Sequence, residues 1–328
     1  MKRRNANEVV FLNPHTCGIY KSGGIRYKTD PATGKRTKEV DNELAEVVDA
    51  YLAGNNSPAI ARSCVEDIFK CQVLVPRYFD SRWDTAISEF TAANQTAEVS
   101  LGKLAEEKVI QITGGHGSPS NDQRTGDIPY VKVSDIRSLR VNVNPTNLVS
   151  RKIAESFWGG PSSGLQGWDL ITPNRASSNI GEFAILLPGE EQIVITKEVF
   201  VIRVIGGAAD GWDPFYLFWA LCLKAVRRQW QRVTLMQTNR EDCGNRYLEV
   251  LLPAPKSREW AAKVSAPFRD YFTALSSAKA NFSEKVKQSG YEFIASVTTG
   301  RAEEENRDSE EELPLDNHAA KTQRNSRP

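Results

Sequence analysis

Apolar residues along this 328-residue chain follow two different spacings, which predict strands in some segments and helices in others. Short apolar runs bounded by glycine, proline or aspartate predict strands in the middle of the chain, at GDIPYVKVSDI, WDLITP, GEFAILLP, QIVITKEVFVIRVI and LEVLLPAP. Further upstream, CQVLVPRYFDSRWD (71–84) is a strand-like run closed by Pro76. Because these strands do not alternate regularly with helices, we expect an α+β fold with a mixed β-sheet.

Helical spacing predicts three longer elements. DNELAEVVDAYLAG is expected to begin at a cap, Asp41, and to end at Gly54. Residues 213–233, DPFYLFWALCLKAVRRQWQRV, are expected to form one helix whose arginines gather near its end. After Ser257 the apolar residues form a heptad-like stripe, interrupted at Lys279, which predicts a long amphipathic spacer helix. Its apolar stripe is expected to pack against a partner and consists of Phe268, Phe272, Leu275, Phe282 and Val286.

These patterns divide the chain into regions of different composition. We expect a small, mainly helical N-terminal region, a mixed-sheet domain, the spacer helix and an acidic, polar tail without fixed structure. Their ranges are 1–95, 96–257, 258–290 and 301–328.

The strand at 126–136 carries a lysine at its centre. Strand alternation places Lys132 on the face opposite Val131 and Val133. Tyr130 should share the exposed side of Lys132. The pattern leaves two interpretations open: a solvated lysine on an edge strand, or the rim of a binding surface.

Charge is distributed unevenly, although the net charge is only +1. Residues 1–40 hold nine Lys/Arg against three acids, whereas residues 301–316 hold eight acids against two arginines. The acidic tail therefore masks a basic excess elsewhere, so the chain can still present a local basic face.

The cysteine content and the hydropathy of the chain indicate its cellular compartment. Five cysteines without a CxxC pair, and no secretory signal pattern, favour unpaired thiols in a reducing cytoplasm. The most apolar run, Phe215–Val226, is too short to cross a bilayer, so no membrane contact is expected.

Motifs for enzyme chemistry are missing from the sequence. No GxxxxGK[ST] or GxGxxG motif is present, and the three histidines are too far apart for a metal site. Ser118 has no GxSxG context, and His116, among glycines, is expected to be a solvated loop residue. We expect a binding protein with no catalytic residues, no metal and no cofactor of its own.

Phrases in residues 98–260 carry a family resemblance. VSLGKLAEEKVIQITGGHGSPS is followed by GDIPYVKVSDI, GWDLITPNRASSNIGEFAILLP, YLFWALCLKAVRRQW and LEVLLPAPKSREW. This order resembles the target-recognition domain of type I restriction–modification specificity subunits, although Glu259–Trp260 replaces the family's closing Glu-Gln. The resemblance implies a DNA target-recognition domain and a spacer helix. With one such domain, the chain would read half of a bipartite site, alone or as a symmetric pair joined through that helix.

A second resemblance covers residues 7–50. NPHTCGIYKSGGIRYKTDPATGKRTKEVDNELAEVV is similar to the tail of N6-adenine DNA methyltransferase subunits. The catalytic DPPY or NPPY tetrapeptide is absent, since Asn13–Pro14–His15 lacks the second proline and the aromatic residue. The resemblance implies either a relic or a region that docks on a separate methyltransferase, where S-adenosylmethionine would bind.

Candidate DNA contacts follow from residue chemistry within this family frame. Arginine and lysine bind phosphates, whereas glutamine, asparagine and arginine read base edges. The competing interpretations are a solvated helix end for the arginines and a polar turn for the QTNRED loop. The candidate residues are Arg124, Lys132, Arg175, Arg227, Arg228, Arg232, Gln237, Asn239 and Arg240.

The sequence thus predicts a non-catalytic DNA-specificity subunit that directs a partner N6-adenine methyltransferase, in restriction–modification or phage defence. A restriction or translocase subunit is a further candidate partner. Two alternatives stay open: a methyltransferase fragment with its own activity, and an interaction subunit without DNA binding whose acidic tail engages something basic.

Overall fold

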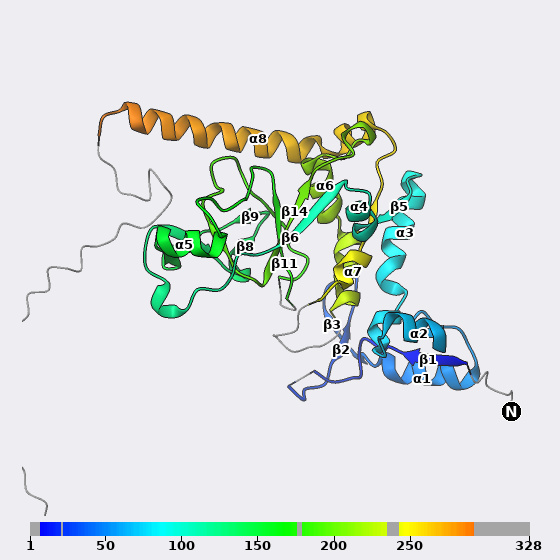
Figure 1. The fold of residues 1–328 in the computed structure, drawn as a ribbon. Helices are drawn as coiled ribbons and strands as arrows, with labels where there is room; N and C mark the ends of the chain where they lie inside the picture. The colour runs from blue at the N-terminus through cyan, green and yellow to red at the C-terminus, as the bar shows by residue number, and fades with distance from the viewer. Residues whose placement is uncertain (1–6, 21, 176–178, 235–242, 292–328) are drawn as a thin grey trace, which may run out of the picture.

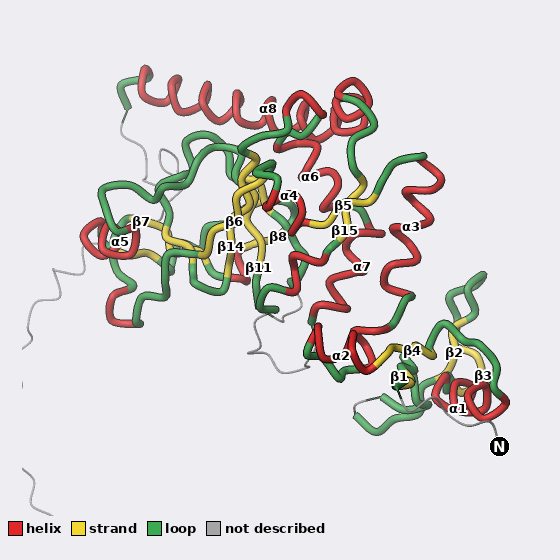
Figure 2. Tube along the Cα trace, turned by 45° about the vertical axis from the view of Figure 1, so that its right-hand side comes forward, coloured by secondary structure: helices red, strands yellow, loops and turns green. Residues whose placement is uncertain are grey.

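The N-terminal region combines small sheets with helices. The computed structural model describes residues 7–20, 22–175, 179–234 and 243–291. β1 (Glu8–Leu12) pairs antiparallel with β4 (Ile60–Cys64), and β2 (Tyr27–Thr29) pairs with β3 (Arg36–Val40). The helices around them are α1 (Glu43–Ala53), α2 (Val65–Cys71), the 3-10 turn η1 (Pro76–Phe79) and α3 (Arg82–Asn94). Figure 2 shows α1 and β1–β4 grouped at one end of the molecule.

Two local predictions for this region have different outcomes. The first helix ends as expected, because Gly54 adopts a left-handed conformation (φ 74°) that lets its N–H cap the helix. Its N-cap is Asn42, one residue after the expected Asp41. The strand predicted over 71–84 is wrong: Pro76, which cannot donate to a sheet, opens η1, and α3 starts at Arg82.

The central part of the chain is a mixed α+β domain, as the pattern predicts. Its largest sheet has the antiparallel order β12-β11-β14-β6, and a second sheet, β10-β7-β13, contains one parallel pair. The first sheet comprises β6 (Ile110–Gly114), β11 (Leu170–Pro173), β12 (Ala184–Ile185) and β14 (Val199–Val204). The second comprises β7 (Ile128–Val131), β10 (Leu148–Val149) and β13 (Val194–Ile195).

Shorter elements connect and flank these sheets. β5 (Glu98–Ser100) pairs with β15 (Leu251–Pro253), and β8 (Ile136–Arg137) pairs with β9 (Arg140–Val141). The helices are α4 (Leu101–Glu106) and α5 (Arg151–Trp158). Single 3-10 turns are η2 (Asn121–Gln123), η3 (Val133–Asp135), η4 (Ala208–Asp210) and η5 (Arg246–Glu249).

The helix predicted over 213–233 is two helices, α6 (Pro214–Cys222) and α7 (Lys224–Val233). The chain is extended at Leu223 (ψ 133°), which separates them. The two helices pack against different neighbours, α6 against α8 and α7 against α3. One straight helix would not satisfy both sets of contacts, so tertiary packing overrides the continuous helical pattern.

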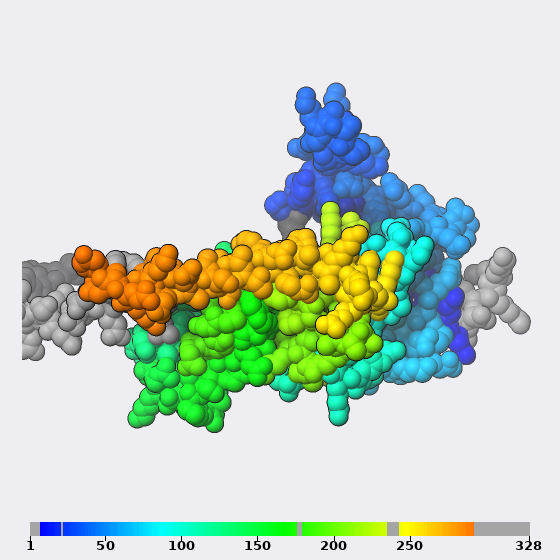
Figure 3. Space-filling model, turned by 90° about the horizontal axis from the view of Figure 1, so that it is seen from above, coloured from blue at the N-terminus to red at the C-terminus, as the bar shows by residue number. Residues whose placement is uncertain are grey.

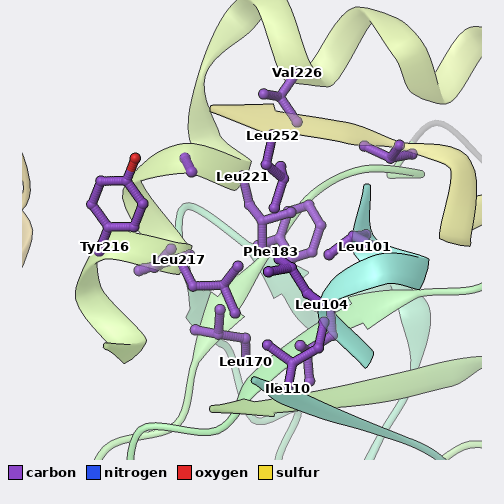
Figure 4. Packing of buried hydrophobic residues seen from close by; sticks show 14 of the residues in the cluster. Leu101, Leu104, Ile110, Leu170, Phe183, Tyr216, Leu217, Leu221, Val226 and Leu252 are labelled. Atoms are coloured by element: carbon purple, nitrogen blue, oxygen red, sulfur yellow. The ribbon is translucent and has the colours of Figure 1, made fainter. Parts of the chain in front are cut away.

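The main core lies between the large sheet and helices α4, α6 and α7. Figure 4 shows Leu101 and Leu104 near Phe183, Leu217 and Leu221. Each of these leucines is at most 1% exposed, so each contributes about 1.5–3 kcal/mol of burial free energy. This core fixes the strand framework from which the loops of the candidate site extend.

The long helix α8 (Arg258–Gln288) confirms the predicted spacer helix. Figures 1 and 3 show it lying along the central domain and continuing past it. Half of its stripe packs on the chain's own domain and not, as expected, on a partner: Phe268 and Phe272 contact Phe218 of α6. Leu275 also joins this core, whereas Phe282 is 53% exposed. Val286 is half-buried.

Candidate nucleic-acid interface

The strand β7 is buried along its whole length, which contradicts the expected exposure of Tyr130. Tyr130 is 3% exposed and packs with Val149, Ala154 and Val194. The alternation argument fails because β7 lies between β10 and β13 and is covered on both faces. The strand ends at Val131, and Lys132 starts the turn η3 instead of occupying a strand position.

Two predicted DNA contacts, Arg124 and Lys132, meet over the ring of Tyr130. The Arg124 guanidinium carbon lies 5.3 Å from the ring centroid, and Lys132 Nζ lies 5.8 Å from it. Lys132 Nζ donates to Asn147 Oδ1 at 2.6 Å, and Arg124 donates from Nε and Nη2 to the Pro119 carbonyl at 3.2 and 3.1 Å. Among the described residues, no carboxylate forms an ion pair with either cationic group. The two side chains are therefore held in place without a described carboxylate to neutralise them.

Electrostatics at this pair favour an anion. Partial burial, and after it the charge of Arg124, lower the pKa of Lys132 from its usual value, while Asp135 acts in the opposite direction. A bound phosphate would offset both unfavourable effects, because it supplies negative charge next to two cations.

The parallel partner strand adds a third cation, Lys197. The Thr196 N–H donates to the Val131 carbonyl at 3.0 Å, so the turn after β13 lies beside the end of β7. Lys197 follows directly, is exposed, and forms no ion pair within the described part of the chain. Arg175, predicted as a DNA contact, lies at the same turn but pairs with Glu198. We call Arg124, Lys132, Arg175 and Lys197 the β7 rim.

Sequence reasoning missed Lys197. The only signal was a lysine just after the run QIVIT. Its importance depends on the parallel pairing of β13 with β7, which joins positions more than 60 residues apart in the sequence. Local periodicity contains no information about such a pairing.

Glycines let the loop between β6 and β7 pass close to this rim. A Cβ at Gly115 would lie 2.0 Å from the Thr196 carbonyl oxygen. At Gly126 (φ +144°), a Cβ would lie 2.3 Å from the backbone nitrogen of Ser150. Larger residues at these two positions would push the loop away from Thr196 and Ser150. The two glycines therefore determine where Arg124 and the start of β7 lie.

His116 fixes the same loop, and its expected role as a solvated residue is wrong. Its Nδ1 accepts from the Ile195 N–H at 3.0 Å, so its Nε2 carries the proton and donates to the Ser163 carbonyl at 2.8 Å. Burial lowers the pKa of His116, which favours the neutral ring that these two bonds require. The histidine is a structural connection between the loop and β13.

The arginines of α7 have different surroundings from those of the β7 rim. Arg227 donates to the Gly181 carbonyl at 2.7 Å and pairs with Glu182 at 2.8 Å. Arg232 pairs with Asp84 at 3.0 Å and lies 5.9 Å from the ring centroid of Tyr78. Only Arg228 of the three is exposed, and the described residues give it no ion pair. The DNA contacts expected of α7 therefore stay predictions, with Arg228 the best placed.

The expected base-reading residues Gln237, Asn239 and Arg240 lie outside the described residues. The chain resumes at Cys243, whose N–H donates to the Asn174 carbonyl at 2.9 Å. This bond places Cys243 next to the residue that precedes Arg175 of the β7 rim.

Comparisons with known proteins bear on the class of the chain. No family model and no curated protein matches it. A chain of the type I R-M system, from a study of its complex assembly, matches with 16% identity and TM-score 0.36, over 75% of this chain and 55% of that one. The HsdS subunit of Thermoanaerobacter tengcongensis matches with 12% identity and TM-score 0.35, over 83% and 62%. The type IIG restriction endonuclease BpuSI matches with 9% identity and TM-score 0.41, over 68% and 33%.

The similar solved structures thus include an HsdS subunit and a chain of a type I R-M system. The chain spans about half the length of the solved proteins it matches. In the described part of the chain, no group of histidine, cysteine or acidic side chains could hold a metal ion, and no helix is long and apolar enough to span a membrane.

Proposed function

We propose that this chain is a DNA sequence-specificity subunit of a restriction–modification system, with residues 96–257 as its target-recognition domain. The observation that carries the proposal is the β7 rim, where Arg124 and Lys132 lie over Tyr130 beside exposed Lys197. Side chains of this kind bind phosphates and fix the register of a protein on a duplex. The rim would hold the DNA backbone while Gln237, Asn239 and Arg240 read bases.

Methyl transfer would belong to a partner N6-adenine methyltransferase, which would bind S-adenosylmethionine. The N-terminal region has a surface suited to such a partner: Ile19, Tyr20 and Ile25 are each 50% exposed or more. Ile19 and Ile25 are joined by a β-bridge, so they form one apolar patch. Exposed apolar patches of this kind favour protein contacts.

The outer half of α8 is a second candidate contact. Phe282 is exposed while Phe268 and Phe272 are covered by α6, so the remaining apolar stripe is available to a partner helix. A second copy of the chain, paired through this half, would let two recognition domains read two half-sites.

Binding to labelled duplex DNA over a salt series tests the proposal. The variant Arg124→Met/Lys132→Met removes both charges of the pair and keeps apolar packing on Tyr130. We expect the slope of log affinity against log salt to fall by about 0.9 for each lost phosphate contact. Lys263→Met, an exposed lysine of α8, is the matched control and should change nothing. An unchanged slope in a variant that melts like the wild type would refute the role of the rim.

A transfer assay separates the proposal from intrinsic methylation. The isolated chain, incubated with DNA and labelled S-adenosylmethionine, should transfer no methyl group. Transfer by the purified chain alone would contradict a non-catalytic role.

A further inference from the structure

The β2–β3 hairpin forms an arm that stands clear of the body of the molecule. Figure 3 shows its blue tip projecting beyond the surrounding surface. Its turn is tightly held: Asp30 accepts from the Ala32 N–H at 2.9 Å and from the Thr33 hydroxyl at 2.7 Å. The Gly34 N–H closes the turn on the Asp30 carbonyl at 2.8 Å. The arm is therefore a formed ribbon and not an open loop.

The two faces of this ribbon differ in charge. On one face Lys28 pairs with Glu39 at 2.5 Å and approaches Glu46 at 3.6 Å, so that face is neutralised. Arg36 lies over the ring of Tyr27, the neighbour of Lys28 on β2, and Lys38 is exposed further along β3, where the register of the ribbon is irregular. The exposed surface of the ribbon that carries Arg36 and Lys38 is called the arm face below.

Cations on the arm face are unneutralised. Arg36 and Lys38 are exposed, as is Lys35 at the turn, and within the described residues none of the three forms an ion pair. The Arg36 guanidinium carbon lies 4.1 Å from the ring centroid of Tyr27, which limits its freedom before any partner arrives. An already ordered cation loses less conformational entropy when it binds an anion.

We infer that the arm face, with Lys35 at its tip, is a second contact with the backbone of double-stranded DNA, outside the target-recognition domain. The inference rests on the proposed function, which supplies DNA as the partner. A two-stranded β-ribbon fits a DNA groove, and exposed lysine and arginine bind the flanking phosphates.

A protein partner fits the arm face less well than DNA. The centres of protein interfaces are depleted in charge and in lysine, whereas the arm face presents Arg36 and Lys38, which pair with no carboxylate of the described residues. The apolar patch formed by Ile19, Tyr20 and Ile25 matches a protein interface better. The N-terminal region thus presents two different surfaces, the cationic arm face and the apolar patch.

The test removes the three arm cations from the full-length chain. Lys35→Ala/Arg36→Ala/Lys38→Ala is compared with Lys108→Ala/Lys256→Ala/Lys263→Ala, which removes the same charge from exposed positions outside the arm, the β7 rim and the outer half of α8. We expect the arm variant to bind every duplex more weakly and to lower the salt slope by about 2–3, at about 0.9 per contact. The control variant should keep the wild-type slope, and the order of preference among sequences should stay unchanged in both.

Additional variants and measurements distinguish the possible outcomes. Lys35→Arg/Arg36→Lys/Lys38→Arg keeps the charge and should restore binding, which excludes misfolding as the cause. If wild type binds DNA and the arm variant binds it with an unchanged slope, the arm inference is wrong and the proposed function survives. If the arm variant keeps DNA binding but loses capture of the methyltransferase, the arm face binds protein and the inference is also wrong. If wild type binds no duplex, the proposed function itself fails.

Discussion

Arg124 and Lys132 of the β7 rim and Arg227 and Arg232 of α7 look alike in the sequence but have opposite surroundings in the fold. Arg124 and Lys132 lie over an aromatic ring, and no described carboxylate neutralises them. Arg227 and Arg232 are both paired with carboxylates. The comparison teaches that a basic stretch identifies a DNA surface only after its acidic neighbours are known.

Arg232 shows what a neutralised arginine does instead. Asp84 belongs to α3, so its ion pair with Arg232 joins the N-terminal region to α7. Tyr78 strengthens this junction by donating its hydroxyl to Glu249 Oε2 at 2.8 Å. Burial raises the pKa of Asp84, and the Arg232 charge acts against that rise. The junction ties the predicted docking region to the central domain.

The largest effect is expected from Arg232→Ala. It would leave the mostly buried Asp84 without its counter-charge, which should cost about 3 kcal/mol of unfolding free energy. Denaturant unfolding measures the loss, and the double variant Arg232→Met/Asp84→Leu should recover much of it. A stability loss below about 0.5 kcal/mol would show that Arg232 behaves like an ordinary surface cation. Its ion pair would then not distinguish α7 from the β7 rim.

Gly115→Ala should destabilise the chain by about 2 kcal/mol and weaken DNA binding, because the new Cβ meets the Thr196 carbonyl and displaces the loop that carries Arg124. Gly114→Ala is the matched control, since a Cβ there has open space. Thermal unfolding and duplex titration of both variants measure the difference. Equal behaviour of the two would show that the loop is not held against the β7 rim.

Lys197→Ala should leave stability within about 0.5 kcal/mol of wild type, because the side chain is exposed. Loss of one phosphate contact should lower the salt slope by about 0.9. Arg227→Ala should lower stability more and change the slope less than Lys197→Ala, since Glu182 already pairs with its charge. If only Arg227→Ala changed the salt slope, α7 and not the β7 rim would contact the phosphates.

The smallest effect is a pH dependence from His116. Its pKa is lowered in the fold, so the unfolded chain binds protons first as the pH falls below about 6.5. The stability contributed by the neutral ring is complete above that pH and declines below it. Urea unfolding at pH 7.5 and 5.5 measures the decline, and His116→Gln should flatten it. An unchanged pH dependence in that variant would show that His116 does not titrate with unfolding.

The sequence by itself determined much of the local structure. Apolar runs located β7, β11, β12, β14 and β15, and the heptad-like stripe located α8, because each depends on spacing within a few residues. Gly54 ended the first helix for an equally local reason, its left-handed backbone.

Tertiary structure alone decided which side chains are available for function. Parallel pairing with β13 buried Tyr130 and brought Lys197 beside Lys132, and Asp84 neutralised Arg232 from 148 positions away. It also split the predicted helix at Leu223 and covered half of the α8 stripe with α6. The physical reason is shared: burial and charge neutralisation depend on groups close in space, whereas a sequence pattern records only groups close along the chain.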